Sequence, residues 1–160
     1  MIQSCICRLI CLHLILLLSG SSGAGDDKRD MPAREAAERF GKAFIAGDLP
    51  AIMKSVDAPF CLDAREIIAD TAKVEEIFRK LIAQRRDLPT ARFHVRKIAT
   101  LAEFRKSKKS PPTRGVSLGE VLGKGGLVVF AEVEMNGRMQ SMWIGVRLSK
   151  GQGKVVGIVD

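Results

Sequence analysis

Three side chains of this sequence could carry acid–base chemistry, namely Asp57, Asp63 and His94. A carboxylate or an imidazole acts as a general base when it lies within hydrogen-bond reach of the proton that it removes. Asp57 falls at the end of a predicted helix, and Asp63 directly follows a predicted strand. For Asp63 the favoured interpretation is turn chemistry, in which a short acidic side chain bonds nearby backbone. These residues are candidate bases rather than assigned ones.

His94 is the one imidazole after the first 24 residues. It alternates with Phe93 and Val95 in a predicted strand, so we expect it on the opposite, basic face. We expect no metal site, because His94 and Cys61 each stand alone without ligand spacing around them. The sequence holds no nucleophile elbow, paired-carboxylate motif or phosphate loop; residues 123–126 (GKGG) favour a turn. We therefore expect no cofactor.

Residues 1–24 are typical of an export signal. Arg8 precedes an apolar run, Leu9–Leu18, that is too short to span a bilayer as a helix. Ser22-Gly23-Ala24 then supplies the small residues of a signal-peptidase site. No cysteine stands where a lipoprotein signal needs one. The pattern predicts a secreted or periplasmic product that contacts a membrane only through this segment, before cleavage.

An alternative interpretation is a retained N-terminal anchor, helped by acylation of Cys5, Cys7 or Cys11. In either case we expect a short lead-in over residues 25–30 and a single domain over residues 31–160. After cleavage Cys61 is the only cysteine, so no intramolecular disulfide can form and packing must hold the fold. Cys61 itself is typical of a small buried strand residue.

The chain is basic, with a formal net charge of +8. Between Arg92 and Arg114 basic residues are frequent and Glu103 is the only acid. Such a surface attracts phosphate, anionic lipid headgroups or acidic polymers, and the candidate polyanion contacts are Lys106, Lys108 and Lys109. The alternative is a solvated strand edge followed by a charged loop. We do not expect nucleic-acid binding, because no recognition motif is present.

Helix signals dominate the first half of the domain. Asp30 precedes apolar residues at helical spacing, and Gly47 ends that pattern. Asp48 is placed to cap a second, shorter helix through about residue 56, and Asp70 to cap a third. The third helix ends before Pro89 and carries one apolar stripe, formed by Val74, Ile77, Phe78, Leu81 and Ile82.

The second half alternates as strands do. A short pair, Pro59–Leu62 and Glu66–Ala69, precedes the third helix. Ala91–Phe104 predicts one long strand, bent by a bulge near Lys97 where the apolar parity slips. The remaining predicted elements are a loop over Arg105–Arg114, a strand over Val116–Leu122 and a last strand over Val155–Val159.

Asn136-Gly137 gives the clearest local prediction, a two-residue hairpin with a type I′ turn. This turn fixes the strand register, which pairs Val133 with Gln140, Ala131 with Met142, Val129 with Ile144 and Leu127 with Val146. The other face then pairs Phe130 with Trp143. Together these elements predict an α+β fold: three N-terminal helices on one face of a strongly bent antiparallel sheet, with about four long strands plus a short strand pair.

This layout resembles the nuclear-transport-factor-2-like superfamily, which includes ketosteroid-isomerase-like and SnoaL-like domains. The resemblance is carried by three features: the Phe44-x-x-Gly47-Asp48 helix ending, the Val56–Phe60 entry into the first strand, and the helix that Asp70 caps. It implies a cone in which the helices and the concave sheet face enclose a pocket. The convex sheet face of such domains often forms a dimer.

The resemblance implies a ligand pocket with Phe60, Leu62, Gln140 and Met142, and a homodimer interface with Phe130 and Trp143 exposed on the convex face. Gln140 also fits a simple rim position. Two functions stay open. One is an exported, non-catalytic module that binds a small apolar ligand or a protein partner; the other is an isomerase- or dehydratase-like enzyme with a pocket Asp as general base. The chain has no Tyr to stabilise an oxyanion, which favours the first.

Overall fold

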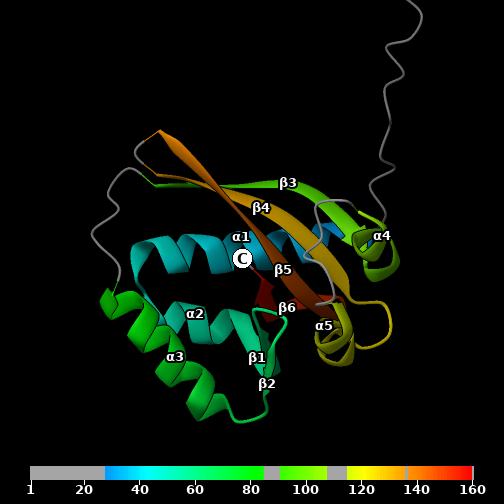
Figure 1. The fold of residues 1–160 in the computed structure, drawn as a ribbon, viewed down its shortest axis with the longest axis horizontal. Helices are drawn as coiled ribbons and strands as arrows, with labels where there is room; N and C mark the ends of the chain where they lie inside the picture. Colours follow the sequence, from blue (N-terminus) through cyan, green and yellow to red (C-terminus); the bar gives the residue numbers. More distant parts are fainter. Residues whose placement is uncertain (1–27, 85–90, 108–114, 136, 160) are drawn as a thin grey trace, which may run out of the picture.

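We describe the fold from a computed structural model of the chain, which describes residues 28–84, 91–107, 115–135 and 137–159. The elements follow in chain order (Figure 1): α1 (Asp30–Ala46), α2 (Leu49–Ser55), β1 (Val56–Leu62), β2 (Glu66–Ile68), α3 (Thr71–Gln84), β3 (Arg92–Thr100), α4 (Leu101–Lys106), α5 (Gly115–Leu122), β4 (Leu127–Met135), β5 (Arg138–Ser149) and β6 (Gln152–Val159). None of the described helices is long and apolar enough to cross a membrane.

The six strands form one curved sheet in the order β2-β1-β6-β5-β4-β3. This confirms the α+β prediction, with one difference: β1 runs parallel to β6, while the other neighbours are antiparallel. The parallel pair follows from connectivity, because β1 comes from the helical half of the chain and joins the edge of a finished meander. Helix α1 lies across the concave face of the long strands (Figure 1).

Of the four predicted helix ends and caps, the structure confirms three, at Gly47, Asp48 and Asp70. Gly47 adopts a left-handed φ of 70° and ends α1, which glycine tolerates without a steric penalty. Asp48 Oδ1 accepts a hydrogen bond from the Ala51 N–H at 3.0 Å, and Asp70 Oδ1 accepts one from Ala72 at 2.8 Å. The prediction that Asp30 caps α1 is wrong, because Asp30 is already helical and residue 29 takes the cap position without a side-chain bond.

The hairpin register is confirmed along its whole length. In the β4–β5 hairpin, Val133 pairs with Gln140, Ala131 with Met142, Val129 with Ile144 and Leu127 with Val146, as predicted. Gly137 has a φ of 73°, which the predicted turn requires, while residue 136 lies outside the described residues. The predicted bulge is also present, since the β3–β4 register shifts between Val95 and Lys97.

Two strand predictions are wrong. The strand predicted over Ala91–Phe104 ends at Thr100, where a capping box with Glu103 starts α4. Glu103 accepts hydrogen bonds from the Thr100 N–H at 2.7 Å and from its hydroxyl at 2.8 Å. Residues 116–122 belong to helix α5, whose Leu118, Val121 and Leu122 are buried at helical spacing. A short apolar run does not by itself distinguish a strand from a buried helix.

Helices α4 and α5 cover the convex face, which corrects a third prediction. We expected Phe130 and Trp143 to be exposed there, yet Trp143 is only 8% exposed. Its ring lies 4.8 Å from that of Phe104 in α4 and 4.7 Å from that of Phe130, measured between centroids. The cover exists because α4 and α5 carry apolar residues that must be buried against the sheet.

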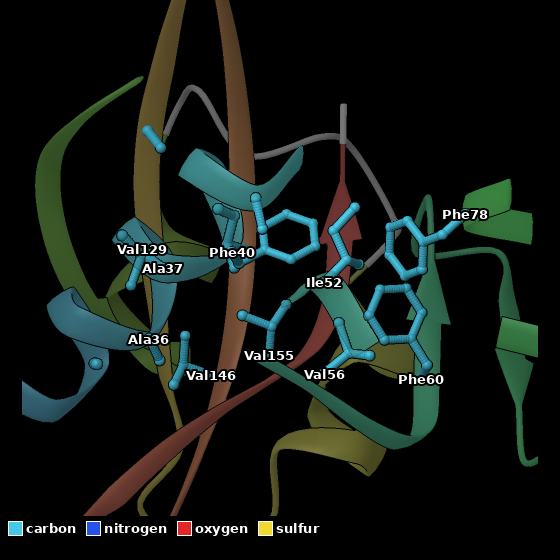
Figure 2. Close-up of a cluster of buried hydrophobic side chains, with 14 of the residues drawn as sticks. Ala36, Ala37, Phe40, Ile52, Val56, Phe60, Phe78, Val129, Val146 and Val155 are labelled. Atoms are coloured by element: carbon cyan, nitrogen blue, oxygen red, sulfur yellow. The ribbon is translucent and has the colours of Figure 1, made fainter. Parts of the chain in front are cut away.

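The main core lies between the concave face and helices α1, α2 and α3 (Figure 2). Its centre is a chain of aromatic rings from three elements. Phe40 in α1 contacts Phe78 in α3 at 5.7 Å, and Phe78 contacts Phe60 in β1 at 5.5 Å, both edge to face. Small residues of α1, Ala36 and Ala37, bring the helix close to the valines of the sheet.

Candidate functional site

The inward face of β5 changes from apolar to polar along the strand. Val146 and Ile144 are fully buried, Met142 is half-buried, and Gln140 is exposed. Alternate residues of a strand face the same side, so these four side chains form one column on the concave face. The fully packed part of the core therefore ends near Met142.

Six half-buried apolar side chains, which we call the concave rim, pack against the edge of the main core. They come from five elements and are Phe44, Leu62, Leu81, Ile82, Met142 and Ile158. Leu62 pairs in register with Ile158, and Ile158 with Ile144, which places them beside the Met142 column. Phe44 stacks on Phe40 at 5.9 Å, one turn nearer the end of α1.

The four predicted pocket residues separate in the structure. Leu62 and Met142 belong to the concave rim, and Gln140 lies exposed beyond Met142 on the same column. Phe60 is 1% exposed and sits inside the aromatic chain, so its ring fills the core. The part that these residues play in binding a ligand stays a prediction.

Asp57 is held in an ion pair with Arg147. Its Oδ2 accepts a hydrogen bond from Arg147 Nη2 at 2.5 Å, and its Oδ1 accepts one from the Ala58 N–H at 3.0 Å. Arg147 follows the inward-facing Val146 on β5, so its side chain is on the convex side of the sheet. The Asp57 carboxylate is thus committed to a structural contact rather than presented to the concave rim.

Arg147 joins three elements and was not anticipated from the sequence. Besides Asp57, its guanidinium donates to the carbonyl oxygen of Ala58 in β1 at 3.0 Å and to that of Val121 in α5 at 3.4 Å. The available signal was a cation placed between Val146 and Leu148 in an otherwise apolar strand. A charge in such a position needs partners.

Asp63 lies in the turn between β1 and β2. It has a φ of 55° and its neighbour Ala64 has a φ of 50°, so both occupy the left-handed region of a tight turn. The Asp63 N–H donates to the carbonyl oxygen of Ile158 at 2.8 Å, which ties the turn to β6. Asp63 therefore belongs to a tight turn, and the side-chain bond to nearby backbone that we expected of it stays a prediction.

His94 and its basic neighbours on β3 face acids on β4. His94 Nε2 lies 3.9 Å from a Glu134 carboxylate oxygen, and Arg96 Nε donates to Glu132 at 2.6 Å. The face that we expected to be basic therefore has mixed charge here. A count along the sequence misses this because the balancing acids come from a strand more than thirty residues away.

The remaining candidates are the lysines expected to contact polyanions, the possible metal ligands and Cys61. Lys106 is exposed at the end of α4, whereas Lys108 and Lys109 lie outside the described residues. Within the described ranges no group of three or more His, Cys, Asp or Glu side chains could hold a metal ion. Cys61 is buried beneath the convex cover, and burial raises the pKa of its thiol.

Comparison with known proteins agrees with this architecture. No family model matches the chain, and no curated protein matches it. Among solved structures, a ketosteroid isomerase-like protein from Erwinia carotovora atroseptica SCRI1043 matches with a TM-score of 0.52 and 11% identity, over 81% of this chain and 92% of that one. A variant of Rd1NTF2_05 matches with a TM-score of 0.50 and 12% identity, over 83% and 98%. The chain therefore has the nuclear-transport-factor-2-like fold.

Proposed function

We propose that this protein is an exported, non-catalytic module that binds a small apolar ligand at the concave rim. The observation that carries the proposal is the rim itself, whose half-buried apolar side chains come from five elements and each pack against the main core. Apolar surface that water still reaches gains free energy when a ligand covers it. The charged candidates for catalysis support the same proposal, because Asp57 bonds Arg147 and Asp63 serves a turn.

The apolar character of the inward column sets the class of ligand. Of the β5 residues on this face from Val146 to Gln140, only Gln140 is polar, and it stands at the outer end. We expect a ligand whose buried part is uncharged, since a charge placed against Met142 would lose its hydration without gaining a partner.

The test uses N-phenyl-1-naphthylamine, a neutral apolar fluorophore, as the probe. Residues 25–160 contain both buried clusters, which span Ala33 to Val159, so a chain that begins at Gly25 keeps the whole described core. We expect saturable binding to this chain. Met142→Lys places a charge at the rim and should weaken the affinity about tenfold or more, equivalent to about 1.4 kcal/mol.

Met139→Lys is the matched control. Met139 lies on the same strand, is 47% exposed and points to the other face, so the same substitution there should leave the affinity unchanged. Circular dichroism checks that both variants are folded. Failure of the parent chain to bind the probe saturably, or an equal loss in both variants, would overturn the proposal.

A further inference from the structure

Exposed lysines gather at the end of the sheet that lies away from the concave rim. We call this surface the basic end; it comprises the exposed Lys28, Lys54, Lys124 and Lys150 together with two half-buried cations, Arg147 and Lys154. Lys150 lies in the β5–β6 turn, and Gly153, just beyond it, packs so closely on α1 that an added Cβ would lie 2.5 Å from the Pro32 carbonyl oxygen. The start of α1, with Lys28, is therefore beside this turn.

Contacts between elements bring the other members to the same place. Arg147 and Lys154 stand directly opposite each other on β5 and β6. Lys154 Nζ donates to the carbonyl oxygen of Lys54 at the end of α2. Lys124 lies in the turn before β4, whose first residue Leu127 pairs with Val146. The start of α1 and the turn before β4 lie at one end of the molecule (Figure 1).

The positive charge of this surface is only partly compensated. Like charges directly opposite each other on neighbouring strands destabilise a sheet. Here Asp57 pairs with Arg147, and helix carbonyls accept from both cations. Among the described residues none forms an ion pair with the four exposed lysines, Lys28, Lys54, Lys124 and Lys150.

We propose that the basic end docks the protein on a membrane surface that contains anionic phospholipid. Charge complementarity carries the proposal: cations near an anionic bilayer each strengthen binding about fivefold, and several lie together here. Helix α1 rises about 21 Å from its first residue, Asp30, to Phe44, so the concave rim lies away from the lipid.

The test measures co-sedimentation of residues 25–160 with vesicles. The vesicles are phosphatidylcholine alone or phosphatidylcholine with phosphatidylglycerol. We expect binding only to the anionic vesicles, weakened by added salt because exposed charges are screened. Lys124→Gln combined with Lys150→Gln removes two exposed turn cations and should lower the partition coefficient about tenfold or more.

The matched control combines Lys42→Gln and Lys73→Gln, two exposed lysines on α1 and α3 outside the basic end. This control lowers the net charge by the same amount but leaves the basic end unchanged. Most of the binding to anionic vesicles should therefore remain. Equal losses in the two double variants would mean that net charge alone acts, and this result would overturn the proposal. So would binding to vesicles without anionic lipid. The naphthylamine affinity should be the same in both double variants, which keeps this test separate from that of the rim.

Discussion

Arg147 binds the carboxylate of Asp57, one of the candidate catalytic acids. Asp57 has the chemistry of a general base, but its carboxylate binds a guanidinium that also holds carbonyl groups of β1 and α5. The Arg147 and Asp57 side chains are 26% and 52% exposed, so solvent screens the pair and its role is mainly to position neighbouring elements. This contact holds the Asp57 carboxylate on the convex side of the sheet, away from the concave rim.

Cys61 leads to a prediction on pH dependence. Burial raises the pKa of its thiol above the ordinary value of 9.0, because the thiolate would lose its hydration. A group whose pKa is raised in the folded state contributes stability that is present below the unfolded pKa and is lost as pH rises towards the folded one. We expect the urea midpoint of residues 25–160 to fall as the pH rises above 9.0.

The control is Cys61→Ala, which removes the titrating group from a buried position. This variant is expected to be less stable at neutral pH and to lose part of the decline at alkaline pH. Lysines also titrate at high pH, so the difference between the two curves is the measured quantity. Parallel curves would contradict the assignment of this pH dependence to Cys61.

At the scale of elements, one side chain of α5 fills a gap between two glycines of the sheet. Gly145 and Gly157 are register partners on β5 and β6, and Leu118 of α5 occupies the space between them. A Cβ at Gly145 would lie 2.6 Å from Leu118 Cδ1, and one at Gly157 would lie 2.9 Å from it. Only glycine leaves room for a leucine to approach the backbone this closely.

Gly145→Ala is therefore expected to destabilise the protein by about 1–3 kcal/mol through overpacking, as measured by urea unfolding. Leu118→Ala alone should also destabilise it, because it leaves a cavity. The double variant should lose less than the sum of the two single losses, since the smaller side chain makes room for the new methyl group. Additive losses would show that Leu118 is not the group that Gly145 accommodates.

At the scale of the whole molecule, the buried apolar side chains of the described residues form two clusters, one on each face of the sheet. The second cluster, on the convex face, bears on whether two copies of the chain could form a dimer there. Homodimerisation through the convex face stays a prediction, but its original support is gone, because Trp143 is covered by α4 of the same chain. A surface that is already buried gains no further hydrophobic free energy from a partner.

Trp143 is the only tryptophan in the chain and reports directly on this cover. We expect residues 25–160 to show blue-shifted tryptophan emission and weak quenching by acrylamide in the native state. We also expect these residues to sediment as a monomer, since the convex face is occupied. Strong quenching that disappears as the protein concentration rises would instead indicate that a second copy covers Trp143.

The sequence by itself determined the features that depend on neighbouring residues. The helix end at Gly47, the caps at Asp48 and Asp70, and the hairpin register all follow from local backbone chemistry and periodicity. The family resemblance combined these local features into the correct fold. Alternating patterns also revealed the bulge near Lys97, because a one-residue slip moves side chains to the other face.

Only the tertiary structure decided which side chains are free to act. Sequence spacing does not report that Asp57 meets Arg147 ninety residues later, or that β4 supplies acids to the basic residues of β3. It also did not show that residues 116–122 belong to a helix on the convex face rather than to a strand. Burial and charge pairing arise between segments distant in the chain, so a site made by such contacts becomes visible only when the segments are folded together.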